Sequence, residues 1–588
     1  SNYDKTSGEI AYTKNGEEKS LENEYSLTTG TNKEGTVANI NANVTAKGTA
    51  SNNKNAIKVS ASNVVKGYNS DKFSITNAIA SGGKYAAGAS VLVNTMQYKT
   101  SAGISGGNVT AEKGNIDVLA NSTIKASIDT IQATIGAAAI GGNVGYFNNK
   151  SATLAEIANA TINGKGVNVN ANSLDEIALN IVSGSVGGID ANLSIALNST
   201  SNTVKSLISG SNVNIVADTV DVIAANNSTL KSQLDSLQIG GASFGVVLNR
   251  TKSNAITQAI ANATGSIKTD GLNFIAKSNG INAETTMNIG NISGLSLSYT
   301  DQGAFVESEF RAGIDNSSLV VENSGTTNIL SGVKDINEDG EYEAAVMNAK
   351  VITKRSSIAL GEGSVTSLNA GVNAQTEAVL NAKHSSNGLN IASKLKRTAD
   401  VGSTSASIGA ISISHLNMKS STKGSNTITI NGDNKIAGKV SVDLNDESKV
   451  STEMIDASLK LLGGESNVST AEIDTDTEIN IGGKLNANEV AVGQTVKRTS
   501  FNTAESDGAL LITVDKYKLE TSSKGKSIVN ISADMTDTNY KNALSVNSNA
   551  TNQAESILSA NKYALAAISK DVSSNTLDAK NTVNLKNA

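Results

Sequence analysis

The chain has 588 residues, a formal net charge of −6, and no Pro or Cys. Without Lys or Arg clusters this charge gives no field for phosphates, so neither nucleic acid nor anionic lipid is an expected partner. The lack of Cys excludes Cys–His catalysis and thiolate zinc sites, and it fits a protein that crosses an oxidising compartment.

The composition favours β-sheet throughout. Average Pro usage of about 5% would give roughly 29 Pro residues in this chain, and Pro is excluded where every backbone N–H must serve in a β-ladder. Aromatic residues make up only 3%, so Ile, Val, Leu and Ala must fill the interior. A persistent period-2 alternation argues against disorder. No run of 18 apolar residues occurs, so no transmembrane segment is predicted.

The first segment differs from the remainder. Residues 1–35 are richer in charge and are predicted to form an irregular or partial N-terminal coil. Residues 36–588 are predicted to form one continuous β-helix with a loop insertion near residues 334–346.

A repeat of about fifty residues becomes visible from Val91 onward. Four similar segments share an Asn at intervals of 54, 50 and 51, at Asn94, Asn148, Asn198 and Asn249. A short apolar-polar-apolar strand recurs at a similar spacing, as "VNV" from Val167, "VNI" from Val213, "LNF" from Leu272 and "VNI" from Val529. A unit of several short strands that repeats in this way predicts a solenoid, in which each repeat buries its core against the next.

We therefore expect an all-β, elongated, right-handed parallel β-helix with two coils per repeat. Roughly two dozen coils at about 4.8 Å each would give a rod on the order of 110 Å long. A propeller is the alternative, but about eleven blades would exceed the usual four to eight. Trimeric stalks require apolar heptads, which the sequence lacks.

The stretch "SNVNIVADTVDVIAA" at residues 211–225 shows how the chain is expected to turn. Val213, Ile215 and Ala217 share one parity, whereas Val220, Val222 and Ala224 share the other. The change of phase at Asp218-Thr219 predicts a corner, after which the inward set of side chains is re-established. Glycine pairs such as Gly187-Gly188 and Gly240-Gly241 suit tight bends.

The densest acidic stretch, "KDINEDGEYEAAV" at residues 334–346, contains the candidate metal site. Asp335, Asn337 and Asp339 reproduce the opening of a calcium loop, and Glu343 occupies its ninth position. The twelfth position, where a bidentate Glu is needed, is Val346. A solvent-exposed loop is therefore favoured, and calcium is the one cofactor that the sequence suggests.

Acid–base catalysis is poorly provided for. His415, in phase with Ile411 and Ile413, is predicted to be buried or stacked, and His384 to lie in a turn. The acids of "EIDTDTEI" at residues 472–479 are predicted to point outward as a solvated face. Some β-helices are polysaccharide lyases, but aromatic side chains that stack on sugars are scarce here. We predict that the chain is not an enzyme and has no catalytic residues, and a polysaccharide-acting enzyme is the weaker alternative.

Repeat units such as "VVLNRTKSNAITQAIANATGSIKTDGLNFIAKSNG" at residues 246–280 resemble the very large, cysteine-free filamentous adhesins of fusobacteria, above all the leukotoxin family of Fusobacterium necrophorum. The resemblance extends from about Val91 to Leu585 and rests on repeat texture. It implies a segment of a virulence protein that is secreted or displayed on the bacterial surface by type V secretion. It also implies an outer-membrane transporter during export and host cell-surface molecules, especially on leukocytes, as partners. A passive spacer within a giant adhesin is the alternative function.

Overall fold

The computed structural model describes residues 11–14, 17–20, 35–47, 55–66, 71–336 and 341–586, and these residues form strands and turns without a helix. The strands are β1 (Ala11–Lys14), β2 (Glu17–Ser20), β3 (Gly35–Ile40), β4 (Val44–Ala46), β5 (Asn55–Val65), β6 (Phe73–Ile104), β7 (Asn108–Ala111), β8 (Asn115–Ala158), β9 (Thr161–Thr269), β10 (Gly271–Lys277), β11 (Ile281–Asn323), β12 (Thr326–Ile336), β13 (Tyr342–Ser386), β14 (Gly388–Ile481), β15 (Lys484–Ile531) and β16 (Ala543–Leu585). From β3 onward they belong to one sheet, whereas β1 and β2 pair with each other in antiparallel fashion.

The chain winds as a parallel β-solenoid, which confirms the predicted fold class. Each repeat, however, forms one coil and not two. Ile116 pairs with Val167, 51 residues later, and Ile455 pairs with Glu505, 50 residues later. Two coils per repeat would have placed partners about half as far apart in the sequence. The prediction of two coils was wrong because a fifty-residue period fixes the length of the unit but not the number of circuits within it.

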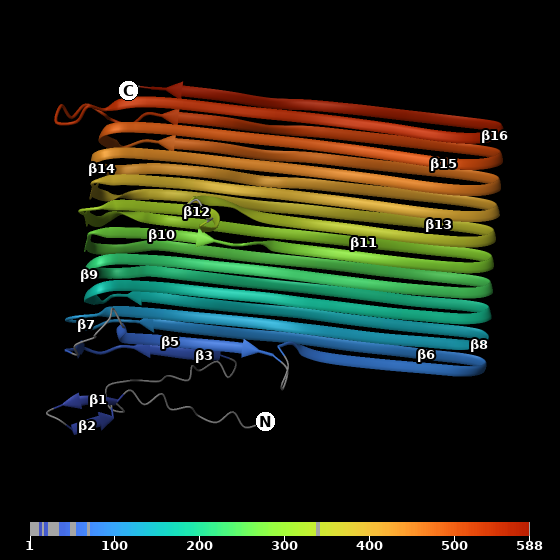
Figure 1. The fold of residues 1–588 in the computed structure, drawn as a ribbon, viewed down its shortest axis with the longest axis horizontal. Coiled ribbons are helices and arrows are strands. Elements are labelled where there is room, and N and C mark those ends of the chain that lie inside the picture. The colour runs from blue at the N-terminus through green and yellow to red at the C-terminus, as the bar shows by residue number, and fades with distance from the viewer. Residues whose placement is uncertain are drawn as a thin grey trace.

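The shape of the molecule changes accordingly. Each coil is a long, flat loop with two layers of strand, and the coils stack from β3 to β16 (Figure 1). The longest dimension lies along the strands, not along the stack. With one coil per repeat at about 4.8 Å, the stack is roughly half the expected 110 Å. The slender rod predicted from the sequence is therefore corrected to a broad slab.

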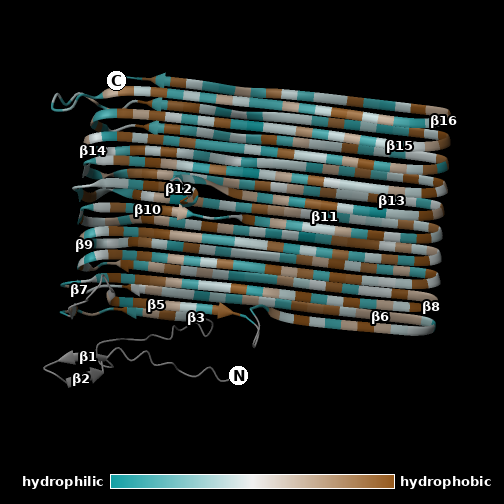
Figure 2. Cartoon of the chain, in the orientation of Figure 1, coloured by the Kyte–Doolittle hydropathy of each residue, from teal (hydrophilic) through white to brown (hydrophobic). Residues whose placement is uncertain are grey.

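Alternation of side chains builds the interior of each coil. Hydrophobic and hydrophilic residues follow one another along the strands (Figure 2), because successive side chains of a strand point to opposite faces. Val213, Ile215 and Ala217 are buried before the corner, and Val220, Val222 and Ala224 are buried after it. Asp218 and Thr219 are both exposed between them. The corner predicted from the change of phase is therefore confirmed.

The short landmark strands fall into separate columns of the stack. Leu272 pairs with Val220, which opens a "VDV" strand, and not with Val213. The strand that contains Val213 stacks elsewhere, since Asn214 N–H donates to Ala160 O at 3.1 Å. The uneven spacing of the early landmarks in the sequence came from joining strands of two columns.

Glycine is required where a corner of one coil approaches the backbone of the next. Gly424, in β14, has φ +120°, and a Cβ there would lie 2.0 Å from Ala374 O. Gly402, in the same strand, has ordinary backbone geometry, and the atom nearest to a Cβ there would be Val351 O at 3.9 Å. The two positions differ in their need for glycine although both sit in one continuous strand.

We expect Gly424→Ala to lower the thermal unfolding midpoint and to cost at least about 1–3 kcal/mol, because it combines backbone strain with a steric clash. Gly402→Ala is the matched control and should leave the midpoint unchanged or raise it slightly, since alanine restricts the unfolded chain. Circular dichroism during heating measures both. Equal unfolding midpoints for the two variants would contradict the conclusion that the backbone at Gly424 requires glycine.

Candidate functional site

The acidic segment interrupts the parallel stack as an antiparallel excursion. Val333 of β12 pairs with Ala344 of β13, and Ile336 pairs with Tyr342, both in antiparallel register. Because of this excursion, Ile281 pairs with Met347, 66 residues later, in place of the usual 50 to 54. The excursion, residues 333–344, is hereafter called the β12–β13 hairpin.

Two of the four predicted calcium ligands lie in the described part of the hairpin. Asp335 accepts hydrogen bonds from Lys277 Nζ on one oxygen and from Asn279 Nδ2, at 2.8 Å, on the other. Hydrogen bonds from Lys277 and Asn279 hold the pKa of Asp335 below its usual value. Glu343 forms an exposed ion pair with Lys334 at 3.5 Å.

The remaining two predicted ligands, Asn337 and Asp339, lie outside the described residues. Within the described residues, no cluster of three or more His, Asp or Glu side chains could hold a metal ion. Lys277 already compensates the charge of Asp335, so calcium would have to compete with an ammonium group at this oxygen. The calcium loop stays a prediction.

Both histidines lie where the sequence did not place them. His384 is almost fully buried within β13, not in a turn, and its Nε2 lies 2.9 Å from Thr327 Oγ1. Burial lowers its pKa to about 4, so it is neutral at physiological pH. His415 is exposed on the outer face together with Ile411 and Ile413. The prediction that His415 shares the parity of Ile411 and Ile413 was correct. The prediction that these residues face the interior was wrong.

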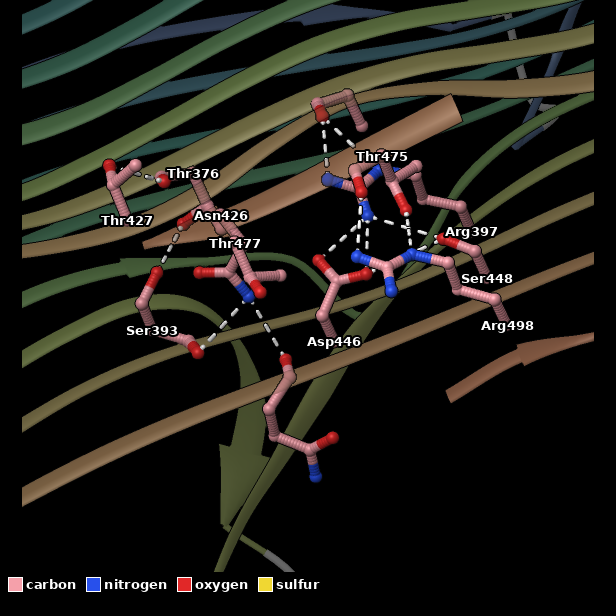
Figure 3. A network of polar contacts seen from close by, with 12 residues as sticks. Thr376, Ser393, Arg397, Asn426, Thr427, Asp446, Ser448, Thr475, Thr477 and Arg498 are labelled. Carbon is pink, nitrogen blue, oxygen red and sulfur yellow. Dashed lines mark hydrogen bonds and ion pairs between the residues drawn. The ribbon is translucent and has the colours of Figure 1, made fainter. Parts of the chain in front are cut away.

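The most heavily bonded polar network in the interior is formed by two arginines and one aspartate (Figure 3). Arg397 and Asp446 are fully buried and form an ion pair, with Arg397 Nη1 at 2.7 and 2.8 Å from the two carboxylate oxygens. Arg397 also donates to Ala374 O at 2.9 Å. Arg498 donates to Thr475 O at 2.7 Å and to Asn552 Oδ1 at 3.1 Å. The network ties successive coils together.

Sequence reasoning missed this network, although a signal was present. Arg397 has the same parity as the buried Leu395 and Ala399, and Asp446 the same parity as the buried Leu444. A charged residue at an inward position requires a partner, because an unpaired buried charge is prohibitively costly. The inward parity of Arg397 and Asp446 could therefore have predicted that both side chains are buried. It could not have predicted that they contact each other.

A second buried cluster centres on Glu465. Lys460 Nζ lies 2.9 Å from Oε1, Lys562 Nζ lies 3.0 Å from Oε2, and the Tyr517 hydroxyl donates to Oε2 at 2.7 Å. Burial raises the pKa of Glu465, but the two ammonium groups outweigh it and lower the pKa to about 2. Nearby, burial and the Glu465 charge raise the pKa of Asp456 to about 6.

A third cluster surrounds Asp175. Asn149 Nδ2, the Thr200 hydroxyl and Asn202 Nδ2 all donate to its Oδ2, at 3.0 to 3.3 Å. Its Oδ1 is buried and accepts no hydrogen bond from any described residue. Burial raises the pKa of Asp175 to about 7, and the three donors only partly offset it. A proton on Oδ1 fits this arrangement.

These clusters serve coil-to-coil cohesion. The charged or titrating groups at their centres are enclosed, and their partners come from neighbouring coils, as when Asn149 and Thr200 meet at Asp175. A catalytic group must reach a substrate, and Arg397, Asp446 and Asp175 are fully buried. The acids Asp474 and Asp476, by contrast, are exposed on the outer face, as predicted.

No protein-family model, curated protein or solved structure matches the chain. Nor does any helix long and apolar enough to cross a membrane occur among the described residues. Function must therefore be inferred from the molecule's own surfaces.

We expect Asp446→Asn to destabilise the fold by about 3–5 kcal/mol, because it leaves the buried Arg397 guanidinium without a counter-charge. The control is Glu489→Gln in the exposed Lys439–Glu489 pair, 2.8 Å apart, which should cost at most about 1 kcal/mol. Denaturant unfolding measures both. The double variant Arg397→Met/Asp446→Leu should recover most of the loss. Equal effects of the two single variants would contradict a structural role for the network.

The raised pKa of Asp175 predicts a specific pH dependence. Between the unfolded value near 4 and the folded value of about 7, the folded chain binds the proton more tightly than the unfolded chain does. This contribution to stability is full below pH 4 and is lost as the pH rises through 7.

Asp175→Asn, which mimics the protonated group, should remove this dependence. The stability of the native chain relative to the variant should fall between pH 4 and pH 7 by on the order of 4 kcal/mol. Urea unfolding at several pH values measures the difference. Asp218→Asn, at an exposed corner, controls for the loss of one charge. A difference that does not change with pH would refute the assignment.

Proposed function

We propose that the chain is part of a secreted or surface-displayed bacterial virulence protein of the leukotoxin and adhesin class. Its coil stack presents a surface to host cells, especially leukocytes, and performs no catalysis. The observation that carries this proposal is the β12–β13 hairpin, the one place from β3 onward where described strands pair in antiparallel fashion. A departure from an otherwise regular stack is where recognition is most simply placed.

The chemistry of the hairpin supports recognition. Ile336 is exposed, and the Asp335 and Glu343 side chains are each 55% exposed. Asp335 is anchored through Lys277 and Asn279 on the preceding coil, which fixes the base of the hairpin to the stack. Acidic and apolar side chains held on an anchored base can bind a partner at a lower entropic cost than those of a free loop can.

The resemblance to fusobacterial adhesins supports the cellular setting. Export through an outer-membrane transporter and an extracellular location follow from that resemblance, and the Cys-free composition is compatible with both. Host cell-surface molecules on leukocytes are then the partners.

A passive spacer is the second candidate function. It is favoured by ladders of uncharged side chains on the outer face, such as Asn328 on Asn273 at 2.8 Å and Asn584 on Asn530 at 2.8 Å. Such ladders stabilise the stack without offering a distinctive feature to a partner.

Flow cytometry of the labelled chain on neutrophils and epithelial cells tests the proposal, with calcium or with chelator. The hairpin variant has residues 337–340 replaced by Gly and Ser, together with Glu341→Gln and Glu343→Gln, and it keeps the Asp335 anchor. We expect saturable binding of the native chain and at least a tenfold loss of affinity for this variant.

The control variant Glu453→Gln/Glu505→Gln removes two exposed charges elsewhere and should bind like the native chain. Loss of binding with chelator would identify the calcium loop as part of the contact. If the folded native chain binds neither cell type, the presentation role is wrong and the spacer role takes its place.

A further inference from the structure

The end of the slab where the chain reverses between its two layers carries an apolar outer surface. This end, the right-hand bends of Figure 1, is hereafter called the distal edge. Large aliphatic side chains are exposed there in successive coils, among them Ile135 (60%), Ile189, Leu295, Leu360 (71%), Ile413 (67%) and Leu461. Soluble proteins expose such residues singly, whereas a contiguous apolar patch marks a site of interaction.

These side chains form a continuous stripe because the coils stack in register. Ile292 pairs with Ile239 on one side and with Ile358 on the other, and Ile358 pairs with Ile408. In the earlier coils Ile135 pairs with Val186. Ile135, Val186, Ile239, Ile292, Ile358 and Ile408 all line one shallow groove along this edge.

At the distal edge, the distribution of polar and apolar side chains between interior and exterior is the reverse of that at the opposite end of the coils. Its interior is polar: Ser185 and Asp190 are buried and hydrogen-bonded to each other, and Arg355 forms an ion pair with Glu362. The Glu465 cluster occupies the same interior. At the opposite end the interior is the main apolar core, which runs from Ile40 to Ala533. The alternation changes parity at the bend, as between the buried Ser183 and Ser185 and the buried Asp190 and Asn192. On both sides of the bend, however, polar side chains point inward and apolar ones outward.

Four of the bends at the distal edge also lack charge, whereas the first bend carries the exposed Lys84. Residues 130–149, 236–249, 285–300 and 401–418 each span a bend and contain no Asp, Glu, Lys or Arg. Charged residues resume directly beyond two of these windows, with Asp235 and Arg250 around one and Glu284 and Asp301 around another. Asp190, in the coil between, is buried inside.

We propose that the distal edge is a docking surface for the hydrocarbon region of a lipid bilayer. Hydrocarbon accepts only surfaces whose backbone groups are already paired. Here the ladder skips a single pair of residues at the bend, Ala137 and Gly188, and resumes at once: Gly136 pairs with Gly187 before it, and Ala138 with Ile189 after it. Protein interfaces are usually anchored by Tyr, Trp, Arg or Met, whereas the groove along this edge is lined mainly by Ile, Val, Leu, Ala and Gly.

The dimensions and the boundary of the edge agree with insertion that stops short of crossing the bilayer. The window 285–300 folds into two arms of about eight residues, each roughly 26 Å long at the rise of a strand, against about 30 Å for a hydrocarbon core. Tyr299 lies near the end of this window, next to Asp301, where an amphipathic ring suits the headgroup level. The edge would enter the bilayer without crossing it.

The proposal does not rest on the hairpin or on any host protein. With a net charge of −6 and no basic cluster, attraction to anionic headgroups cannot drive binding. Zwitterionic lipid should therefore be sufficient.

Flotation with phosphatidylcholine vesicles, and with vesicles containing one fifth phosphatidylserine, tests the proposal without cells. We expect the native chain to float with both kinds of vesicle to within twofold, at low and at high salt. The variant Ile292→Thr/Ile358→Thr/Ile408→Thr keeps β-branched residues in the stripe and should reduce the bound fraction at least tenfold. The matched control Val64→Thr/Val216→Thr/Val583→Thr, at exposed positions away from the edge and from the hairpin, should bind within twofold of the native chain.

Three outcomes would overturn the proposal. The folded native chain could fail to float with either vesicle, or it could float only with anionic vesicles at low salt. Sedimentation could instead show a dimer that the stripe variant dissociates, which would make the edge an interface between two copies. Circular dichroism of each variant confirms that it is folded.

Discussion

In-register pairing between coils is the constraint on which every other feature depends. Each backbone segment hydrogen-bonds to the segment one repeat later, as Ile116 does to Val167, so every side chain lies above its counterpart. Like residues therefore stack in columns along the solenoid. The stacked side chains of each column must interact favourably with one another. Uncharged Asn achieves this by hydrogen-bonding to itself, as in the Asn480–Asn530–Asn584 ladder. Pro, which breaks such ladders, is absent from the sequence.

The same constraint explains how charge enters the interior. A buried charge cannot stack on a like charge, so each of these charges is paired with an opposite charge from its own coil or from a nearby one. Asp446 meets Arg397 from a coil 49 residues earlier, and Glu465 gathers Lys460 and Lys562. These clusters stabilise the register as well as the fold, because a shifted strand would leave an unpaired charge in the interior.

Function is best placed where the repeating pattern is broken or inverted. The β12–β13 hairpin breaks it with an antiparallel excursion, and the distal edge inverts it with apolar side chains outside and polar ones inside. In our two proposals, the hairpin binds a macromolecular partner through acidic and apolar groups, and the distal edge meets lipid with an apolar face that is uncharged in four of its bends. The two features lie on different parts of the coil, so they can act independently.

The strands, the fifty-residue period and the corner at Asp218-Thr219 could all be predicted from the sequence, because parity and repetition are local properties of the chain. The sequence did not determine the number of coils per repeat, the pairing of Arg397 with Asp446, or the positions of His384 and His415. Which face of each strand points inward depends on the packing of the folded coils. Alternation separates two faces but reads the same when they are exchanged, and at Ile411, Ile413 and His415 the apolar face is the outer one.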